Sequence, residues 1–264
     1  MNIAIVTGAS SGMGREFVTQ IDHAYNKLNE IWVISRRQDK LVELQKNVKT
    51  TVKIIPLDLT GKNSYKVLSL LLEEQKPVIK MLVNSAGYGM IGDFGESALD
   101  EELGMIELNC TALTAITHIC IPYMGNGSRI IQLASSAAFL PQPNFAVYAA
   151  TKSYVLSFSR ALNRELQEKG VYVTAVCPGP VQTEFFGIAE THESMALYKK
   201  HTMVQALGVV KKAMKDSSDR KELSVYSMPI KLLRIATKIL PHSFILSILN
   251  KSKSTKVIKS NEEN

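Results

Sequence analysis

The first 24 residues place a short apolar run, a glycine-rich turn and a helical pattern one after another. Residues 3–6 predict a strand, and the turn that follows reads Thr7-Gly8-Ala9-Ser10-Ser11-Gly12-Met13-Gly14. Glycines let a backbone approach a phosphate closely, and the N-terminus of a helix offers free N–H groups. This order predicts a phosphate-binding loop, although its spacing differs from Gly-x-Gly-x-x-Gly. A glycine-rich turn without a ligand is the alternative.

The same alternation of apolar runs and helical patterns continues along the chain. Nearly every run ends in polar or small residues, and ligands bind at the carboxyl ends of strands in open parallel sheets. We therefore expect one α/β domain, and 264 residues with 45% hydrophobic and 21% charged side chains suit a globular protein. The further strands are expected at 31–34, 52–56, 79–83, 129–133, 171–176 and 223–226, with long helices at 100–123 and about 147–169.

Two arginines follow the second predicted strand. An acidic residue at this place would bond the ribose 2′-hydroxyl of NAD, whereas Arg36 and Arg37 offer guanidinium groups that pair with a phosphate. The sequence therefore favours NADP(H) as the cofactor, with Arg36 carrying most of the preference. After the third strand, Asp58 either bonds the adenine amino group or caps the helix begun at Thr60.

Tyr148 and Lys152 lie one turn apart in a predicted helix, so they share a face. A nearby ammonium favours the phenolate, and we expect Lys152 to lower the pKa of Tyr148 toward neutrality. Such a phenol would give or take a proton. Taken alone, the pair is also compatible with a half-buried tyrosine and a solvated lysine. Asn109, inside the long helix 100–123, is mildly unfavourable there and hints at a polar role.

Composition narrows the location and the partners. The net charge is +7, but much of the basic excess falls after residue 210, and no zinc-finger or RNA-binding motif is evident, so we do not predict a nucleic-acid partner. No metal site is predicted. The three cysteines have no CxxC spacing and suit reduced thiols. The N-terminus enters a strand directly, so we expect no secretory leader and a cytoplasmic protein.

These residues together resemble the short-chain dehydrogenase/reductase family over residues 3–183. One departure is Ser85, where the family more often has Asn. The matching motifs, in the family's order, are Thr7-Gly8-x3-Gly12-x-Gly14, Asp58, Asn84-x-Ala86-Gly87, Asn109, Ser135, Tyr148-x3-Lys152 and Pro178-Gly179.

The resemblance implies a Rossmann fold, with a seven-stranded parallel sheet in the order 3-2-1-4-5-6-7 and helices on both faces. It implies that Tyr148 is the general acid/base and that Ser135 holds the substrate oxygen. Lys152 would lower the tyrosine pKa and bind the nicotinamide ribose, and Asn109 would anchor a proton-relaying water. The cofactor would contact Gly8, Ser10, Ser11, Gly12, Met13, Gly14, Arg36, Arg37, Asp58, Leu59, Asn84, Ala86, Gly87, Tyr148, Lys152, Pro178, Gly179, Val181 and Thr183.

From these features we expect an NADP(H)-dependent oxidoreductase that interconverts a carbonyl and a secondary alcohol on a small apolar substrate. The alternative is a dinucleotide-binding regulator without turnover. The catalytic domain is expected at residues 1–227, with a substrate lid at 184–201, followed by a polar tail at 251–264.

Residues 228–250 predict an amphipathic helical extension, with Lys231, Arg234 and Lys238 on one face. Such a helix packs across a homodimer or homotetramer interface, covers the cleft, or lies on an anionic membrane. We favour the first two, because the resembling family often forms oligomers. Peripheral membrane contact is the alternative.

Overall fold

A computed structural model describes residues 1–191 and 203–247, and its centre is a parallel sheet of seven strands. The strand order is β3-β2-β1-β4-β5-β6-β9, which confirms the predicted 3-2-1-4-5-6-7 order because β9 is the seventh strand of this sheet along the chain. The strands are β1 (Asn2–Thr7), β2 (Glu30–Ser35), β3 (Thr51–Pro56), β4 (Val78–Asn84), β5 (Arg129–Leu133), β6 (Tyr172–Val176) and β9 (Leu223–Ser224).

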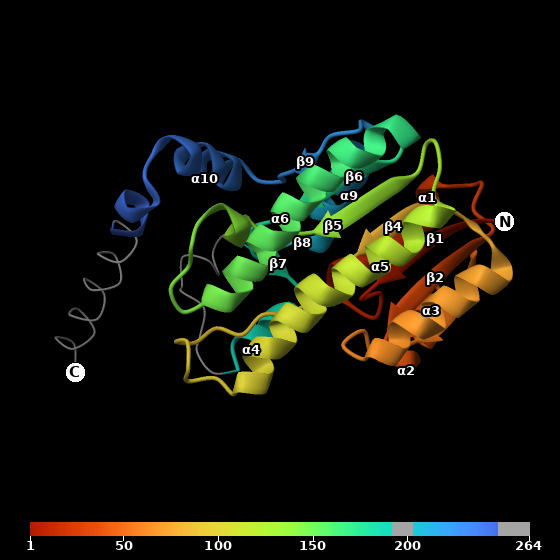
Figure 1. The fold of residues 1–264 in the computed structure, drawn as a ribbon, viewed down its shortest axis with the longest axis horizontal. Coiled ribbons are helices and arrows are strands. Elements are labelled where there is room, and N and C mark those ends of the chain that lie inside the picture. Colours follow the sequence, from red (N-terminus) through yellow and green to blue (C-terminus); the bar gives the residue numbers. More distant parts are fainter. Residues whose placement is uncertain (192–202, 248–264) are drawn as a thin grey trace.

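Helices cover both faces of this sheet (Figure 1). Side chains alternate along β1, so Ala4 and Val6 pack toward α1, α2 and α9, whereas Ile3 and Ile5 pack toward α3, α5 and α6. Burial on both faces explains why the strands read as continuous apolar runs. The helices are α1 (Gly12–Ala24), α2 (Gln38–Gln45), α3 (Lys62–Gln75), α4 (Leu99–Ile106), α5 (Leu113–Cys120), α6 (Ala146–Leu166), α7 (Phe185–Ala189), α9 (Ala206–Ser218) and α10 (Met228–Ile239).

The long predicted helix at 100–123 is one helical run with a changed hydrogen-bond pattern in its middle. Helices α4 and α5 are joined by a π-helical segment, Glu107–Ala112, and a 3₁₀ turn, Ile121–Tyr123, ends the run. This run is long and apolar enough to cross a membrane, a test that core helices also pass. Here α5 packs on β4 and lies beside α3, as a covering helix of the sheet does.

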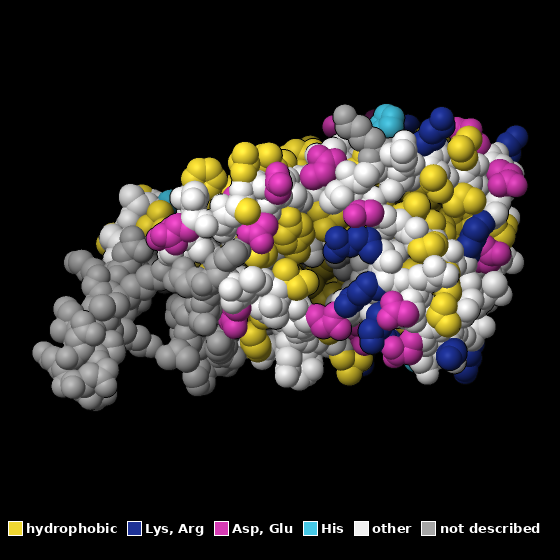
Figure 2. Space-filling model, turned by 90° about the horizontal axis from the view of Figure 1, so that it is seen from below, with side chains coloured by type: hydrophobic (Ala, Val, Ile, Leu, Met, Phe, Trp, Pro, Cys, Tyr) yellow, Lys and Arg dark blue, Asp and Glu magenta, His cyan; other side chains and the backbone are white. Residues whose placement is uncertain are grey.

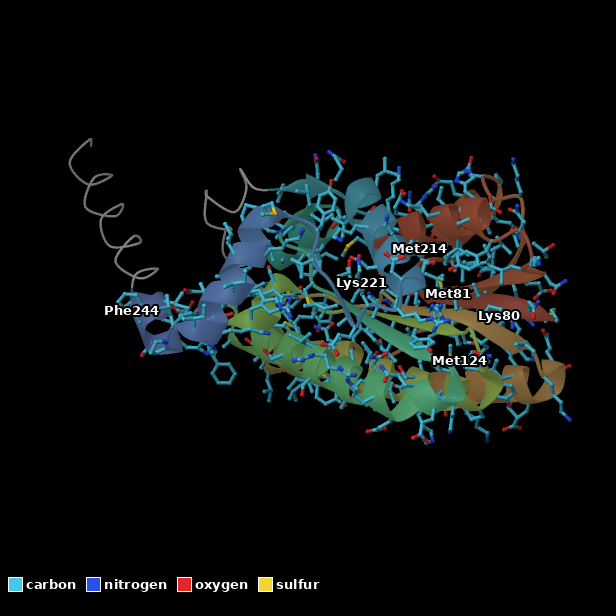
Figure 3. All side chains as sticks on the ribbon, turned by 90° about the horizontal axis from the view of Figure 1, so that it is seen from above. Lys80, Met81, Met124, Met214, Lys221 and Phe244 are labelled. Atoms are coloured by element: carbon cyan, nitrogen blue, oxygen red, sulfur yellow. The ribbon has the colours of Figure 1, made fainter. Side chains whose placement is uncertain are left out.

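Residues after β6 depart from the expected alternation. A second sheet of two parallel strands, β7 (Val181–Gln182) and β8 (Val204–Gln205), was not predicted, because two-residue strands leave no periodic signal. The last strand of the main sheet covers only Leu223–Ser224 of the expected 223–226. The C-terminal segment extends from one end of the molecule, where Phe244 lies far from Lys80 (Figure 3).

The described surface carries mixed charge. On the face in Figure 2, lysine and arginine side chains lie next to acidic ones. Among the described side chains, Arg15 pairs with Glu43 at 2.8 Å and Arg160 with Glu222 at 3.2 Å. Pairs of this exposed kind contribute little to stability.

Candidate active site

The glycine-rich turn forms a tight cradle between β1 and α1. Gly8 and Gly12 have φ values of +67° and +52°, where glycine is favoured. A Cβ at Gly8 would lie 2.8 Å from the backbone of Ala86, and one at Gly14 would meet the carbonyl of Gly8. Ser11 caps α1 without a side-chain hydrogen bond to the helix, and the first turn holds no acidic residue. Uncapped helix N–H groups beside a backbone without side chains suit a pyrophosphate.

Arg37 follows β2 and reaches back over this cradle. Its Nε and Nη2 donate to Ser10 Oγ at 3.3 and 3.1 Å. Its Nη1 lies 2.8 Å from a carboxylate oxygen of Glu184, just before α7. The guanidinium is therefore held at the glycine turn, where a phosphate would also be bound.

Arg36, which the sequence favoured over its neighbour, is exposed and lies toward Asp58. Asp58 accepts hydrogen bonds from the amide and hydroxyl of Thr60 at 3.0 and 2.8 Å, so it caps the turn before α3. Partial burial alone would raise the pKa of Asp58, but the bonds from Thr60 and the charge of Arg36 outweigh burial and lower this pKa. Leu59 is buried in the core, and Met13 packs against the core on the other face of the sheet.

The turn after β4 is tied to β1. Thr7 Oγ1 accepts hydrogen bonds from the amides of Ser85 and Ala86 at 3.1 and 3.2 Å, which brings this turn against Gly8. Asn84 points into the interior, where its Nδ2 donates to Thr117 Oγ1 at 2.9 Å. Its side chain therefore positions the turn, and only its backbone lies near the cradle.

Asn109 lies fully buried in the π-helical segment. Its amide exchanges hydrogen bonds with the backbone of Tyr88 at 2.9 and 3.1 Å and donates to Thr151 Oγ1 at 3.0 Å. A Cβ on Gly87 would lie 2.7 Å from Asn109 Oδ1 and 3.4 Å from Lys152 Nζ. Asn109 thus joins the β4 turn to α6 next to the lysine, and π-helical segments are frequent at functional sites.

The other three predicted catalytic residues meet at the carboxyl ends of β5 and β6. Tyr148 and Lys152 are buried on one face of α6, with Lys152 Nζ 5.5 Å from the centroid of the tyrosine ring. The Ser135 side chain hydrogen-bonds the Tyr148 phenol. Lys152 Nζ donates to the carbonyl of Leu133 at 2.8 Å. The structure therefore assembles the predicted set.

The expected lowering of the Tyr148 pKa is wrong for this structure. Burial raises the pKa of Tyr148 to about 12, against the hydrogen bond from Ser135. Burial also lowers the pKa of Lys152 to about 8, against the nearby thiols of Cys110 and Cys177. The loss of hydration is the largest cause of both shifts, and Lys152 donates its hydrogen bond to the carbonyl of Leu133 and not to the phenol.

Phe145 and Gly89, which contact Tyr148, were missed from the sequence, whereas Phe185 belongs to the predicted lid. Phe145 stacks on the Tyr148 ring with centroids 4.2 Å apart, and Phe185 lies 5.5 Å away. A Cβ on Gly89 would lie 2.5 Å from Tyr148 Cδ2, so only glycine fits there. The three-residue spacing of Phe145 and Tyr148 could have indicated a shared helix face. The remaining buried members of this cluster are Met90, Met105, Ala137 and Ala149.

The residues that follow β6 contact the site and α10. The carbonyl of Pro178 accepts the amide of Ser136 at 2.8 Å. Ile230 of α10 covers Gly179, where a Cβ would lie 3.0 Å from its side chain. The inner side of α10 thus packs on this chain, whereas Leu232, Ile235 and Ile239 on its outer side are exposed.

The predicted lid at 184–201 is described only to residue 191. Val181 is buried in β7, and Thr183 packs against the glycine turn, 3.3 Å from where a Cβ on Gly12 would lie. Phe185 and Phe186 follow, with ring centroids 5.3 Å apart. This segment therefore lies beside both the glycine turn and Tyr148. Residues 192–201, and the tail at 251–264, lie outside the described residues.

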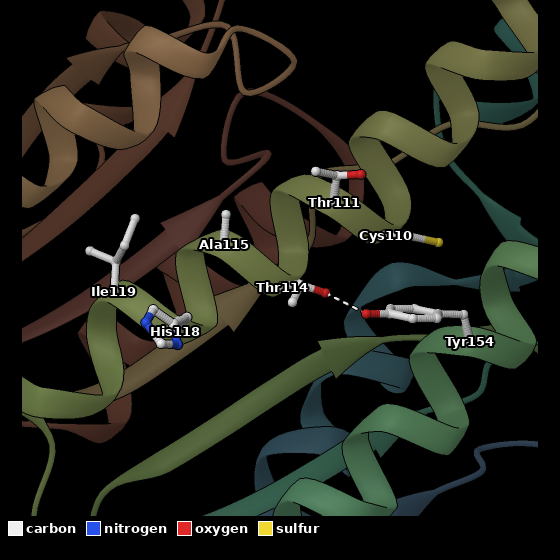
Figure 4. Close-up of a pocket in the computed structure, with 7 residues that line it drawn as sticks. All are labelled: Cys110, Thr111, Thr114, Ala115, His118, Ile119 and Tyr154. Carbon is white, nitrogen blue, oxygen red and sulfur yellow. Dashed lines mark hydrogen bonds between the residues drawn. The ribbon is translucent and has the colours of Figure 1, made fainter.

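A separate pocket of about 570 Å³ is lined by residues of α5, of the π-helical segment before it and of α6, and Tyr148 is not among them (Figure 4). Thr114 Oγ1 and Tyr154 Oη are hydrogen-bonded at 2.8 Å across it. Its lining residues are Cys110, Thr111, Thr114, Ala115, His118, Ile119 and Tyr154.

Comparisons with known proteins concern the family and the fold of this chain. A family model described as short chain dehydrogenase matches residues 2–194. Sulfoacetaldehyde reductase 2 of Chromohalobacter salexigens is 33% identical over 217 residues, which cover 78% of this chain and 84% of that protein.

Solved structures share the fold. A short-chain dehydrogenase from Sphingobium yanoikuyae in complex with NADPH has a TM-score of 0.75 at 23% identity, covering 97% of this chain and 95% of that one. A short-chain dehydrogenase/reductase from Burkholderia phymatum in complex with NAD has a TM-score of 0.77 at 18% identity, covering 90% and 93%. At these identities the likeness concerns the fold alone.

Proposed function

The chain belongs to the short-chain dehydrogenase family of oxidoreductases, which bind nicotinamide dinucleotides, and from this premise we propose a finer function. The protein uses NADP(H) to interconvert a carbonyl and a secondary alcohol on an apolar substrate. The observation that carries the proposal is a buried phenol and a buried ammonium group beside a phosphate cradle, with the hydroxyl of Ser135 hydrogen-bonded to the phenol.

Tyr148 acts as the general acid in the reducing direction. Burial keeps its phenol protonated at neutral pH, and Ser135 hydrogen-bonds it, so the two hydroxyls converge on one point. A carbonyl oxygen bound there would receive two hydrogen bonds in a site from which water is excluded, where such bonds stabilise a developing alkoxide most. The bound dinucleotide would supply the hydride that the carbonyl carbon accepts.

Lys152 and Asn109 hold the groups around this acid. Lys152 Nζ is anchored by the carbonyl of Leu133 and lies beside Gly87, where it would bind the ribose of the cofactor. Asn109 fixes the backbone of Tyr88 and the hydroxyl of Thr151. Its amide therefore keeps the β4 turn and α6 at the spacing that the catalytic set requires.

The cradle and Arg37 fit an NADP(H) molecule. The pyrophosphate would lie on the uncapped N-terminus of α1, and the 2′-phosphate would bind the guanidinium that Ser10 holds over the turn. We assign the larger share of the NADP(H) preference to Arg37, and Arg36 supports it from the side of Asp58.

The substrate site is apolar. Phe145, Phe185, Met90 and Met105 surround Tyr148, and side chains of this kind favour burial of an apolar group next to the carbonyl. Sulfoacetaldehyde, after which one relative is named, carries an anionic sulfonate. A sulfonate would need polar or cationic side chains around it, whereas an apolar substrate suits the side chains of this cluster.

The test is NADPH oxidation at 340 nm with a set of aryl and alkyl ketones and aldehydes, and with sulfoacetaldehyde for comparison. We expect turnover with an apolar carbonyl and little with the sulfonate. Parallel assays with NADH measure the cofactor preference. Cofactor binding without turnover on any carbonyl would instead support the dinucleotide-binding regulator.

We also propose a cytoplasmic homodimer or homotetramer. All three cysteines are free thiols, which suits a reducing compartment. The exposed outer residues of α10 support an oligomer interface. Light scattering should show a smaller assembly after truncation at Ser227. An unchanged assembly, or co-sedimentation of the full chain with anionic liposomes that truncation abolishes, would contradict this assignment.

A further inference from the structure

Glu184 joins the two parts of the phosphate cradle. Its carboxylate lies 2.8 Å from Arg37 Nη1 and also hydrogen-bonds the side chain of Ser11, at the N-terminus of α1. The hydrogen bond from Arg37 lowers the pKa of Glu184, so the group is charged at neutral pH. An anion from the chain itself therefore lies where a phosphate of the cofactor would be recognised.

The hydrogen bonds of Arg37 show what a phosphate must replace. A guanidinium has five N–H donors in a fixed plane. Ser10 Oγ accepts from Nε and Nη2, and Glu184 accepts from Nη1. Ser10 is neutral and would tolerate a phosphate nearby, whereas the Glu184 carboxylate would repel it. A phosphate that binds Arg37 therefore competes with Glu184.

We propose that Glu184 is a cofactor-selectivity residue, whose carboxylate competes with the 2′-phosphate of NADP(H) for Arg37. The proposal rests on the NADP(H) preference proposed above. NADH carries no phosphate at that position, so it gains little when Glu184 is neutral. Glu184 thus limits the advantage of NADPH over NADH that Arg37 provides.

The Arg37–Glu184 ion pair is weak enough for a phosphate to displace it. Their side chains are 44% and 56% exposed, and exposed pairs are weak because water and salt screen them. A doubly charged phosphate with a bidentate hydrogen bond outcompetes a single carboxylate. The pair therefore reduces phosphate affinity without preventing phosphate from binding.

The test is isothermal titration of the full chain, in the absence of nicotinamide cofactor, with 2′,5′-ADP and with 5′-AMP. The two probes differ by the 2′-phosphate alone. The variant is Glu184→Gln, which keeps the shape and removes the charge. The matched control is Glu43→Gln, because Glu43 forms an equally short ion pair with Arg15 at 2.8 Å and its side chain is 52% exposed.

We expect Glu184→Gln to tighten 2′,5′-ADP binding by about three- to tenfold and 5′-AMP binding by less than about twofold. Glu43→Gln should change neither probe by more than about twofold. In an Arg37→Ala background, Glu184→Gln should lose its selective effect, because the shared partner is gone.

Other outcomes would overturn the proposal. Equal tightening of both probes would mean that Glu184 acts at the glycine turn and not through Arg37. Unchanged or weaker 2′,5′-ADP binding would exclude competition, even if the parent prefers this probe. A parent that binds both probes alike would contradict the NADP(H) preference itself. Failure of the proposed cofactor preference is thus distinguished from failure of the Glu184 proposal.

Discussion

The phosphate end and the catalytic end of the site hold their charged groups in opposite surroundings. Arg37 and Glu184 are about half exposed and bind each other across water-accessible space. Tyr148 and Lys152 are 7% and 6% exposed. Tyr148 lies among aromatic and aliphatic side chains, and the Lys152 ammonium group lies against the carbonyl of Leu133. Arg37 follows β2 of the main sheet and Glu184 follows β7 of the small second sheet, whereas Tyr148 and Lys152 both come from α6.

The difference shows which force controls each end. At the phosphate end, solvent screens the Arg37–Glu184 ion pair, so a phosphate can replace Glu184 at little cost in free energy. The choice between cofactors then depends on their charge. At the catalytic end, the loss of hydration raises one pKa and lowers the other, so burial decides the protonation state. Substitutions at the two ends should therefore affect different measurements.

The largest effect is expected for Tyr148→Phe. In the proposed mechanism the phenol is the proton donor at the substrate oxygen, so turnover should fall by at least about a hundredfold. NADPH affinity, measured by titration, should stay within about twofold because the dinucleotide is held mainly at the other end. Near-normal turnover in this variant would refute the assignment of the acid.

Lys152 should make stability depend on pH. Its folded pKa of about 8 is below its ordinary 10.5, so the unfolded chain binds the extra proton between these values. Lys152 by itself should then raise the free energy of unfolding from pH 8 to 10, by at most about 3 kcal/mol. The buried thiols of Cys120 and Cys177, whose pKa values burial raises, oppose this rise as the pH passes the ordinary thiol value of 9.0. Above pH 10, Tyr148 opposes this rise, because its folded pKa is raised and the unfolded chain loses its proton first.

Urea denaturation of the parent and of Lys152→Met at several pH values measures this effect. The Met variant fills the same space without a charge and keeps the cysteines, so the parent should gain stability relative to the variant between pH 8 and 10. Parallel profiles for the two proteins would show that Lys152 is not desolvated.

Gly89→Ala should disturb the catalytic end selectively. The added Cβ would lie within 3.0 Å of both the Tyr148 and the Phe145 ring, and overpacking of this kind costs about 1–3 kcal/mol. Thermal unfolding should show the loss, together with reduced turnover. Gly125→Ala is the matched control, because a Cβ there meets nothing within 4 Å. Equal stability of the two variants would contradict the close contact.

The smallest effect is expected at the phosphate end, for Arg37→Ala compared with Arg36→Ala. Arg37 lies on the glycine turn, so its loss should weaken NADPH binding by about tenfold and leave NADH binding nearly unchanged. Arg36→Ala should have a smaller effect of the same kind. Titration with both cofactors measures this, and a larger effect of Arg36→Ala would restore the order that the sequence favoured.

Much of the fold could be predicted because its signals are local. Buried parallel strands read as apolar runs, and the glycine turn, Arg36-Arg37 and Tyr148-x3-Lys152 stand at fixed places after them. The strand order followed from the resemblance and is confirmed. The helix expected around Tyr148, with its end near residue 169, is observed as α6, which ends at Leu166.

Some site features could not be predicted because they arise from segments far apart in the chain. Gly89 meets the Tyr148 ring across 59 positions of sequence, and Glu184 meets Arg37 across 147. Neither contact changes the local pattern of its own segment. The two-residue strands β7 and β8 are too short for any periodicity.

The sequence by itself determined the alternation of strands and helices and the glycine turn, because local spacing and residue type encode them, and its resemblance to a family pointed to the candidate catalytic side chains. The tertiary structure decided the protonation of Tyr148 and Lys152 and the partner of Arg37. A pKa depends on how much water surrounds a group, and an ion pair depends on which carboxylate lies within reach. Both quantities are set only when α6, the β4 turn and the segment after β7 pack together.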